Sequence, residues 1–334
     1  MGSTVSNKGH GTEPVGTSGP WLVCMLGVGR VGSNHLTRSL GSVPEIDSRA
    51  EIFNKARSYA LTRPELKELS RRLGKRFKPS NRNPKALRAI KRRPGLVLDC
   101  IAALRQPQKR IVSFKVIFSQ LTAGLIARQI IGRPDTIIVF LRRRPVEVYI
   151  SQMKAWRLQE WHSVDTTDLK IQVDADEFLK WRRARDIWYR RLEAACWYRN
   201  KPFQHLTYED DIDRRQSEAI YRFCALLEPY GLTGFTMPDD AKIKGLFRQD
   251  RNEDIADRVA NWPDFQRRLE TMGCLDKAFE PFQRFQPNAW DHVLRGLFGL
   301  GRAIHRLLFS RSDRTVRAAM PDESAPALGS GRNS

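Results

Sequence analysis

Short runs of apolar residues alternate with longer segments of helical periodicity along most of the chain. Each run is rich in residues that favour β-strands and is bounded by turn-forming residues, which is typical of a buried strand. These runs are WLVCML (21–26), RIVSFKV (110–116), TIIVFL (136–141) and FQHLTY (203–208). The helical patterns cover residues 33–40, 64–74, 119–131, 145–160, 176–199 and 214–229. Strands that alternate with helices predict an α/β domain whose central sheet is mainly parallel and flanked by helices.

The two ends of the chain lack this pattern. Residues 1–19 and 312–334 are rich in Gly, Ser, Thr, Pro and charged residues, so they would bury too little apolar surface to offset the entropy lost on ordering. We therefore predict one domain over residues 20–311 between two disordered tails. Near its end, residues 248–270 should form a loop and a helix, and residues 289–311 a basic amphipathic helix interrupted by glycines.

The formal charge of +21 is concentrated in one segment. Residues 57–110 contain 17 Lys or Arg against three acids, Glu65, Glu68 and Asp99, so this segment alone supplies +14. A field of this sign raises the encounter rate with anions. A solvated surface of Arg-rich helices would account for it, and so would nucleic acid, anionic lipid, an anionic cofactor or an acidic substrate.

The sequence lacks the signals of a membrane or disulfide-linked protein. No apolar run reaches the roughly 18 residues that span a bilayer, and no basic segment followed by an apolar one opens the chain. We therefore expect a cytoplasmic protein. The five cysteines are odd in number, widely spaced and free of CxxC pairs. This spacing argues against a disulfide framework and a zinc site, so buried thiols are expected.

The stretch LVCMLGVGRVGSNHL (22–36) passes from a predicted strand through three glycines into a predicted helix. Gly27, Gly29 and Gly32 match GxGxxG, the dinucleotide-binding fingerprint, and Asp47 follows about 20 residues after the loop. That acid should end a second strand, but the preceding SVPEI contains a proline and few strand formers. An NAD(P)-dependent oxidoreductase is therefore an alternative with weak support.

The same glycines fit the outer frame of a P-loop. However, Ser33 and Asn34 stand where a P-loop has its Lys and its Ser or Thr. Without that Lys and that hydroxyl, magnesium-dependent ATP hydrolysis is not expected. What remains is an anion site at a helix N-terminus, with Arg30 inside it as a fixed positive charge. The loop should bind a 5′-linked phosphate group without a metal ion.

A second motif follows the strand predicted at 136–141. RRRPVEVYIS (142–151) places Arg143 at the end of the strand, Pro145 at the start of a helix, and Ser151 eight residues after that arginine. This arrangement would put a guanidinium and a hydroxyl on one side of the first helical turns, around a second phosphate. Three consecutive arginines at a strand's carboxyl end are costly to leave unpaired, which also indicates an anionic ligand.

Together the two motifs resemble those of sulfotransferases that use 3′-phosphoadenosine 5′-phosphosulfate (PAPS). GRVGSNHL (29–36) is similar to their 5′-phosphosulfate loop, R-S-G-S/T-T-x-L, and departs from it at Val31 and Asn34. RRPVEVYIS (143–151) matches their 3′-phosphate motif, R-[D/N]-P-(x)5-S, except at Arg144. Within that superfamily the chain looks most like the bacterial carbohydrate sulfotransferases of the Stf0 and nodulation-factor type. Further similar motifs are AEIFN (50–54), SFKVIFSQL (113–121), EWH (160–162) and Tyr-Glu-Asp (208–210).

The resemblance implies a P-loop-like three-layer fold and transfer of a sulfuryl group from PAPS to a hydroxyl of a carbohydrate or glycolipid. It implies donor contacts from Arg30, Val31, Gly32, Ser33, Asn34, His35, Arg143, Ser151 and Trp161, and from Arg248 and Arg251 on a late closing loop. Arg30, the amides of residues 32–34 and Lys115 would hold the sulfonate and bridging oxygens. Glu51 is the candidate general base, with His35 or His162 in reserve, and no metal is required.

The basic segment at residues 57–110 bears on the identity of the acceptor and on the alternative functions. The resemblance places acceptor-binding elements at residues 57–110, so an anionic saccharide or a glycolipid at a charged membrane would explain its charge. The helix at 289–311 could lie at such a membrane surface or pack against the domain. The rival from another class is a non-enzymatic protein that binds nucleic acid or an anionic membrane through this segment.

Overall fold

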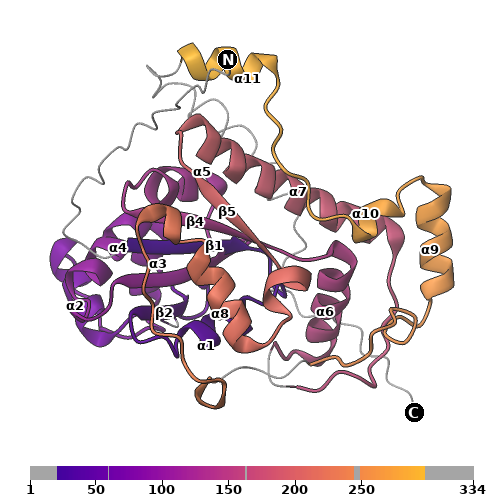
Figure 1. Ribbon diagram of the computed structural model, residues 1–334, viewed down its shortest axis with the longest axis horizontal. Coiled ribbons are helices and arrows are strands. Elements are labelled where there is room, and N and C mark those ends of the chain that lie inside the picture. Colours follow the sequence, from indigo (N-terminus) through magenta and orange to yellow (C-terminus); the bar gives the residue numbers. More distant parts are fainter. Residues whose placement is uncertain (1–20, 59, 162–163, 244–248, 298–334) are drawn as a thin grey trace, which may run out of the picture.

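The computed structural model describes residues 21–58, 60–161, 164–243 and 249–297. Five parallel strands form one sheet in the order β2-β3-β1-β4-β5. The strands are β1 (Trp21–Gly27), β2 (Ile46–Glu51), β3 (Ile111–Ile117), β4 (Thr136–Arg142) and β5 (Phe203–Thr207). The predicted α/β fold with a parallel central sheet is confirmed (Figure 1).

Helices cover both faces of this sheet, which gives three layers. α1 (Ser33–Leu40) and α8 (Gln216–Ala225) pack together below the sheet in the view of Figure 1. On the other face, α5 (Ala123–Ile126) and α7 (Ala175–Tyr198) lie above the sheet in that view. The π-helix η1 (Ala127–Ile131) packs against α5, α7 and α4 (Pro94–Ala103). Because both faces are covered, every residue of β4 and all but one residue in each of β1 and β3 are buried.

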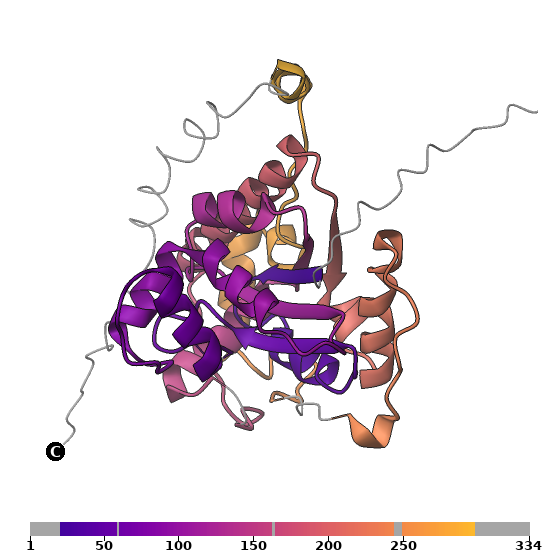
Figure 2. The ribbon, with the colours of Figure 1, turned by 90° about the vertical axis from the view of Figure 1, so that its left-hand side faces the viewer.

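The remaining elements surround this core. They are α2 (Arg63–Arg72), α3 (Pro84–Arg92), α6 (Pro145–Leu158), η2 (Tyr208–Ile212), η3 (Glu228–Tyr230), η4 (Asp240–Lys242), α9 (Trp262–Thr271), α10 (Asp276–Phe279) and α11 (Ala289–Leu297). The helices α2 and α3 pack beside α4, and Figure 2 shows this purple group at one side of the molecule. Pro64, Pro84 and Pro94 each stand in the first turn of their helix, where the missing N–H costs nothing.

All four predicted strands are present, and so are the six helices predicted between residues 33 and 229, of which 119–131 forms α5 and η1. The stretch SVPEI was not expected to form a strand that ends at Asp47, and none ends there, but the sequence analysis missed β2, which begins at Ile46 and forms the edge strand beside β3. Only Ile46 and Arg49 of β2 are buried, so the strand carries no apolar run. Asp47 lies near its start and pairs with Arg49 at 2.7 Å, not at the strand end that a dinucleotide ribose would require.

Several other predictions concern the ends and the cysteines. The predicted tails and residues 298–311 of the amphipathic segment lie outside the described residues, and α11 is the part of that segment that the structure describes. Four thiols are buried as predicted, Cys274 is half-buried, and no cysteine forms a disulfide. Within the described ranges, no helix is long and apolar enough to cross a membrane.

Candidate active site

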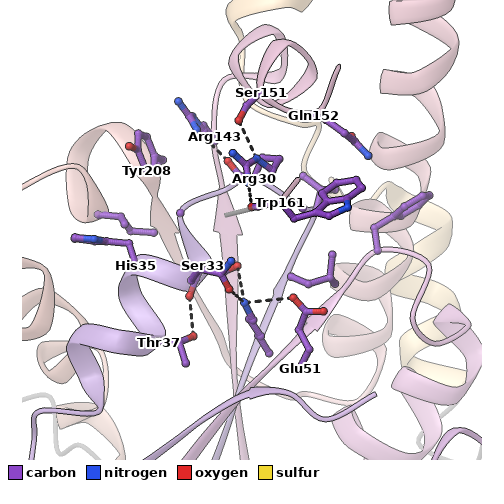
Figure 3. Close-up of a pocket in the computed structure, with 18 of the residues that line it drawn as sticks. Arg30, Ser33, His35, Thr37, Glu51, Arg143, Ser151, Gln152, Trp161 and Tyr208 are labelled. Carbon is purple, nitrogen blue, oxygen red and sulfur yellow. Dashed lines mark hydrogen bonds and ion pairs between the residues drawn. The ribbon is translucent and has the colours of Figure 1, made fainter. Parts of the chain in front are cut away.

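A cavity of about 800 Å³ opens at the carboxyl edge of the sheet. Because parallel strands end at the same edge, the segments after β1, β2, β3 and β4 all line it. Figure 3 shows Arg143, Ser151 and Arg30 gathered toward one end and Glu51 toward the other, with Ser33 between them. The two motifs that we expected to bind one ligand therefore share one cavity.

The glycine loop enters the cavity at the N-terminus of α1. Gly32 adopts a left-handed conformation with φ 79°, and no side chain caps the helix that follows. Its first backbone N–H groups have no acceptor within the helix, so they can bind an anion. A Cβ on Gly32 would lie 2.5 Å from Cδ2 of Tyr208, which explains why only glycine fits. Val31 turns away and is buried in the core.

Replacing Gly32 with Ala should therefore damage the loop, while Gly29→Ala should not. The positive φ and the Tyr208 contact should cost about 1–3 kcal/mol of unfolding free energy. A Cβ on Gly29 meets nothing within 4 Å, and its φ is not positive, so it is the matched control. Urea denaturation of both variants tests this expectation. Equal midpoints for the two variants would contradict the role given to Gly32.

Arg30 reaches from the glycine loop toward α6. Its Nε donates to Ser151 Oγ at 2.8 Å, and its terminal nitrogens donate to the Trp161 carbonyl and to Gln249 Oε1. Burial, followed by the charge of Arg143, lowers the pKa of Arg30 to about 10, so the guanidinium remains charged at neutral pH. We expected Arg30 to hold sulfonate oxygens together with Lys115. The structure places its guanidinium beside Ser151 instead.

Arg143 lies over the ring of Tyr208, with 4.0 Å between its Cζ and the ring centroid. Its NH1 donates to the Arg30 carbonyl at 3.0 Å, and its NH2 lies 3.4 Å from Oε2 of Glu147. Its Nε is buried and has no hydrogen-bond partner among the described residues. A buried guanidinium N–H without an acceptor is costly, and a phosphate oxygen would satisfy it.

Glu147 and Arg258 support Arg143, and the sequence analysis missed both. The buried Arg258 guanidinium binds the Glu147 carboxylate through two bonds of 2.5 and 2.6 Å. Because this carboxylate also contacts Arg143, it fixes the position of the guanidinium that faces the cavity. Arg258 follows Glu147 by 111 residues, so no local sequence signal could connect them.

Lys115 and Glu51 form the other end of the cavity. Lys115 Nζ lies 3.4 Å from Glu51 Oε1 and 3.5 Å from Ser33 Oγ, and it also contacts Asn34 Oδ1. Burial lowers the pKa of Lys115, and the neighbouring Glu51 carboxylate opposes that shift. Glu51 Oε2 accepts one hydrogen bond of 2.7 Å from Asn54 and another of 2.7 Å from Gln120. The sequence analysis assigned no role to Gln120. This network holds a carboxylate and an ammonium beside the N-terminus of α1.

The other candidates divide between the cavity and its surroundings. His35, Asn34 and Trp161 line the cavity. Arg251 does not, because its exposed side chain pairs with Asp165 at 2.7 Å, and its neighbours Gln249 and Asp250 line the cavity instead. Arg248 and the reserve base His162 lie outside the described residues.

The three consecutive arginines at the end of β4 have three different environments, which corrects our argument for a shared anion. Arg142 is fully buried, pairs with Glu193 and lies over Tyr189, with 4.6 Å between Cζ and the ring centroid. Arg144 is exposed, and its backbone N–H donates to Glu209 Oε1 at 2.9 Å. Only Arg143 lines the cavity.

The fold and this site define an α/β protein whose glycine loop opens a helix at the carboxyl edge of a parallel sheet. A family model described as the sulfotransferase family matches residues 21–228. The match covers more than half of the chain, so the protein belongs to the sulfotransferase family. No curated protein matches the sequence. Membership of this family removes the support for an oxidoreductase.

The family match ends before several residues that complete the cavity. Gln249, Asp250 and Arg258 all line it and lie beyond residue 228. Among the described residues, no group of three or more His, Cys, Asp or Glu side chains could hold a metal ion.

Proposed function

We propose that this sulfotransferase moves the sulfuryl group of PAPS to a hydroxyl of a carbohydrate or glycolipid, as the Stf0 and nodulation-factor type does. One observation carries the proposal. A single cavity joins the uncapped N-terminus of α1 to Arg143, whose buried Nε has no hydrogen-bond acceptor. PAPS carries a phosphosulfate at its 5′ end and a phosphate on its 3′ oxygen, so it needs two separate anion sites.

The residues present fit such a donor. Arg143, Ser151 and Arg30 would bind the 3′-phosphate, since their guanidinium and hydroxyl groups lie together at one end of the cavity. The backbone amides from Gly32 to Asn34 would bind the 5′ end at the helix N-terminus. Trp161 lines the cavity and offers an indole ring for stacking on the adenine.

Lys115 and Glu51 would act on the reacting groups. The donor supplies an SO₃ group on a phosphate leaving group, so positioning and charge stabilisation account for most of the catalysis. Glu51 would accept the proton of the acceptor hydroxyl while that oxygen bonds to sulfur. Lys115 and the α1 amides would stabilise the negative charge on the bridging oxygen as its bond to sulfur breaks. The products are a sulfate ester and adenosine 3′,5′-bisphosphate.

Binding of adenosine 3′,5′-bisphosphate tests the donor site directly. At about 100 times its dissociation constant, the nucleotide should raise the free energy of unfolding by about 2.7 kcal/mol, measurable as a thermal shift. Arg143→Ala and Ser151→Ala should reduce this shift, and so should removal of the 3′-phosphate from the nucleotide. Arg144→Ala is the matched control, because Arg144 is exposed and does not line the cavity. A wild-type protein that shows no shift, or an equal loss in Arg144→Ala, would refute the donor site.

A further inference from the structure

A row of basic side chains leads from the mouth of the cavity along α3. We name it the basic track and define it as Lys55, Lys85, Arg88, Lys91 and Arg92. Lys55 lines the cavity, close to Glu51, and is exposed. On α3, Lys85, Arg88 and Lys91 follow one another at intervals of three residues, so they lie along one side of the helix.

One contact places the segment that leaves the cavity beside the start of α3. The backbone N–H of Ser58 donates to the Asn81 carbonyl at 2.9 Å, just before α3 begins. Ser58 follows Lys55 by three residues, so the track continues from the cavity to α3. The pKa of Lys91 on α3 is lowered by burial and then by the charge of Lys55, which agrees with this placement.

The acids of this region do not neutralise the four basic residues of the track that belong to α3. Glu65 pairs with Arg49 at 2.8 Å, Glu68 with Arg71 and Arg72 at 2.7 Å each, and Asp99 with Arg133 at 2.6 Å. In the described part of the chain, no carboxylate forms an ion pair with Lys85, Arg88, Lys91 or Arg92. Like charges that cluster without counterions destabilise a fold, and a bound polyanion would relieve that repulsion.

The surroundings of the track favour a saccharide over a membrane or a nucleic acid. None of the large exposed apolar side chains in the described residues lies on α2 or α3, so nothing there could insert into a bilayer or stack on bases. The track also starts beside Glu51, the residue to which an acceptor hydroxyl must come. An extended anionic ligand that begins at Glu51 and is bound through its charges fits these observations.

We propose that the acceptor is an acidic oligosaccharide or polysaccharide, whose carboxylate or sulfate groups bind the basic track while one hydroxyl reaches Glu51. This inference rests on the proposed function, because it takes the cavity as the sulfuryl-transfer site. In this proposal the track selects acceptors by their negative charge. It binds the part of the saccharide that extends beyond the sugar that reacts.

A charge-removal variant with a matched control tests this proposal. The track variant is Lys85→Gln, Arg88→Gln, Lys91→Gln, three residues of α3 that do not line the cavity. The control variant is Lys180→Gln, Arg183→Gln, Arg190→Gln, which removes three exposed charges from α7. The probes are labelled heparosan, which carries glucuronate, a neutral chitooligosaccharide of equal length, and vesicles of phosphatidylglycerol.

The wild-type protein should bind heparosan in preference to the neutral chain, and added salt should weaken that binding. Each exposed ion pair that is lost should weaken binding about two- to threefold, so the track variant should bind about tenfold more weakly and the control variant within about twofold. Equal weakening in both variants, or no preference for heparosan, overturns the proposal. If the track variant loses vesicle binding and keeps heparosan binding, a membrane surface replaces the saccharide.

The thermal shift with adenosine 3′,5′-bisphosphate separates this inference from the proposed function. The wild-type protein, the track variant and the control variant should show the same shift, since none of the substituted residues lines the cavity. If all three proteins lack the thermal shift while the track variant still binds heparosan more weakly, the proposed donor site is refuted and the proposed polyanion-binding surface is supported. If the shift is present and heparosan binding is unaffected by the track variant, the acceptor inference alone is overturned.

Discussion

Replacing Glu51 with Gln should slow sulfuryl transfer by about 10²–10⁴-fold, the usual contribution of a positioned general base. The amide cannot accept the proton of the acceptor hydroxyl, yet it keeps the shape of the carboxylate between Asn54 and Gln120. Single-turnover transfer of labelled sulfate from PAPS measures the loss. The nucleotide thermal shift should stay close to the wild-type value, because Arg143, Ser151 and Arg30 lie at the other end of the cavity and the α1 amides are unchanged.

Asp47→Asn is the matched control for this experiment. Asp47 lies on the same strand as Glu51, but its carboxylate pairs with Arg49 and does not line the cavity. The same loss of one negative charge should leave turnover within about twofold of wild type, since Asp47 lies outside the cavity and Arg49 keeps its second partner Glu65 at 2.8 Å. Turnover that is unchanged in Glu51→Gln would remove Glu51 from the base role and leave His35 as the reserve base that lines the cavity.

Gln120 offers a second test of the same network. Its amide donates to Glu51 Oε2 at 2.7 Å, while its oxygen accepts from the backbone N–H of Ile117 at 3.0 Å. Gln120 is therefore a positioning residue, and Gln120→Leu should lower kcat less than Glu51→Gln does. The loss should fall on kcat and leave the KM for PAPS close to the wild-type value, because Gln120 holds Glu51 and not the donor. An unchanged kcat would assign Gln120 a purely structural part.

Local sequence patterns were sufficient to predict most of the strands and the two phosphate motifs. The runs that became β1, β3 and β4 are apolar because helices bury both faces of these strands. The edge strand β5 buries only Leu206 and was found from its strand-forming residues. β2 could not be found either way, because its sequence IDSRAE contains no apolar run and few strand formers. The two phosphate motifs were located because each combines a strand end, a helix start and a few polar residues within a short stretch.

The sequence could not predict the contacts that join distant segments at the site. Arg30 reaches Gln249 across 219 positions, and Glu147 meets Arg258 across 111. The late loop was expected to contribute Arg251, but its neighbours Gln249 and Asp250 face the cavity. The burial of Arg142 could not be predicted either, because it depends on Glu193, which lies 51 positions away on α7.

That buried pair supports the largest stability effect that we expect. Glu193→Gln leaves the Arg142 guanidinium fully buried without a counterion, which should cost about 3–5 kcal/mol of unfolding free energy. His205 adds no further positive charge there, because burial and then the charges of Arg142 and Arg284 lower its pKa to about 3 and keep it neutral. The paired change Arg142→Met, Glu193→Leu should recover most of the loss, since it removes both charges. Glu177→Gln, an exposed change on the same helix, should stay within about 0.5 kcal/mol of wild type. Urea denaturation compares the four proteins, and a single Glu193→Gln variant as stable as Glu177→Gln would show that Arg142 does not depend on its partner.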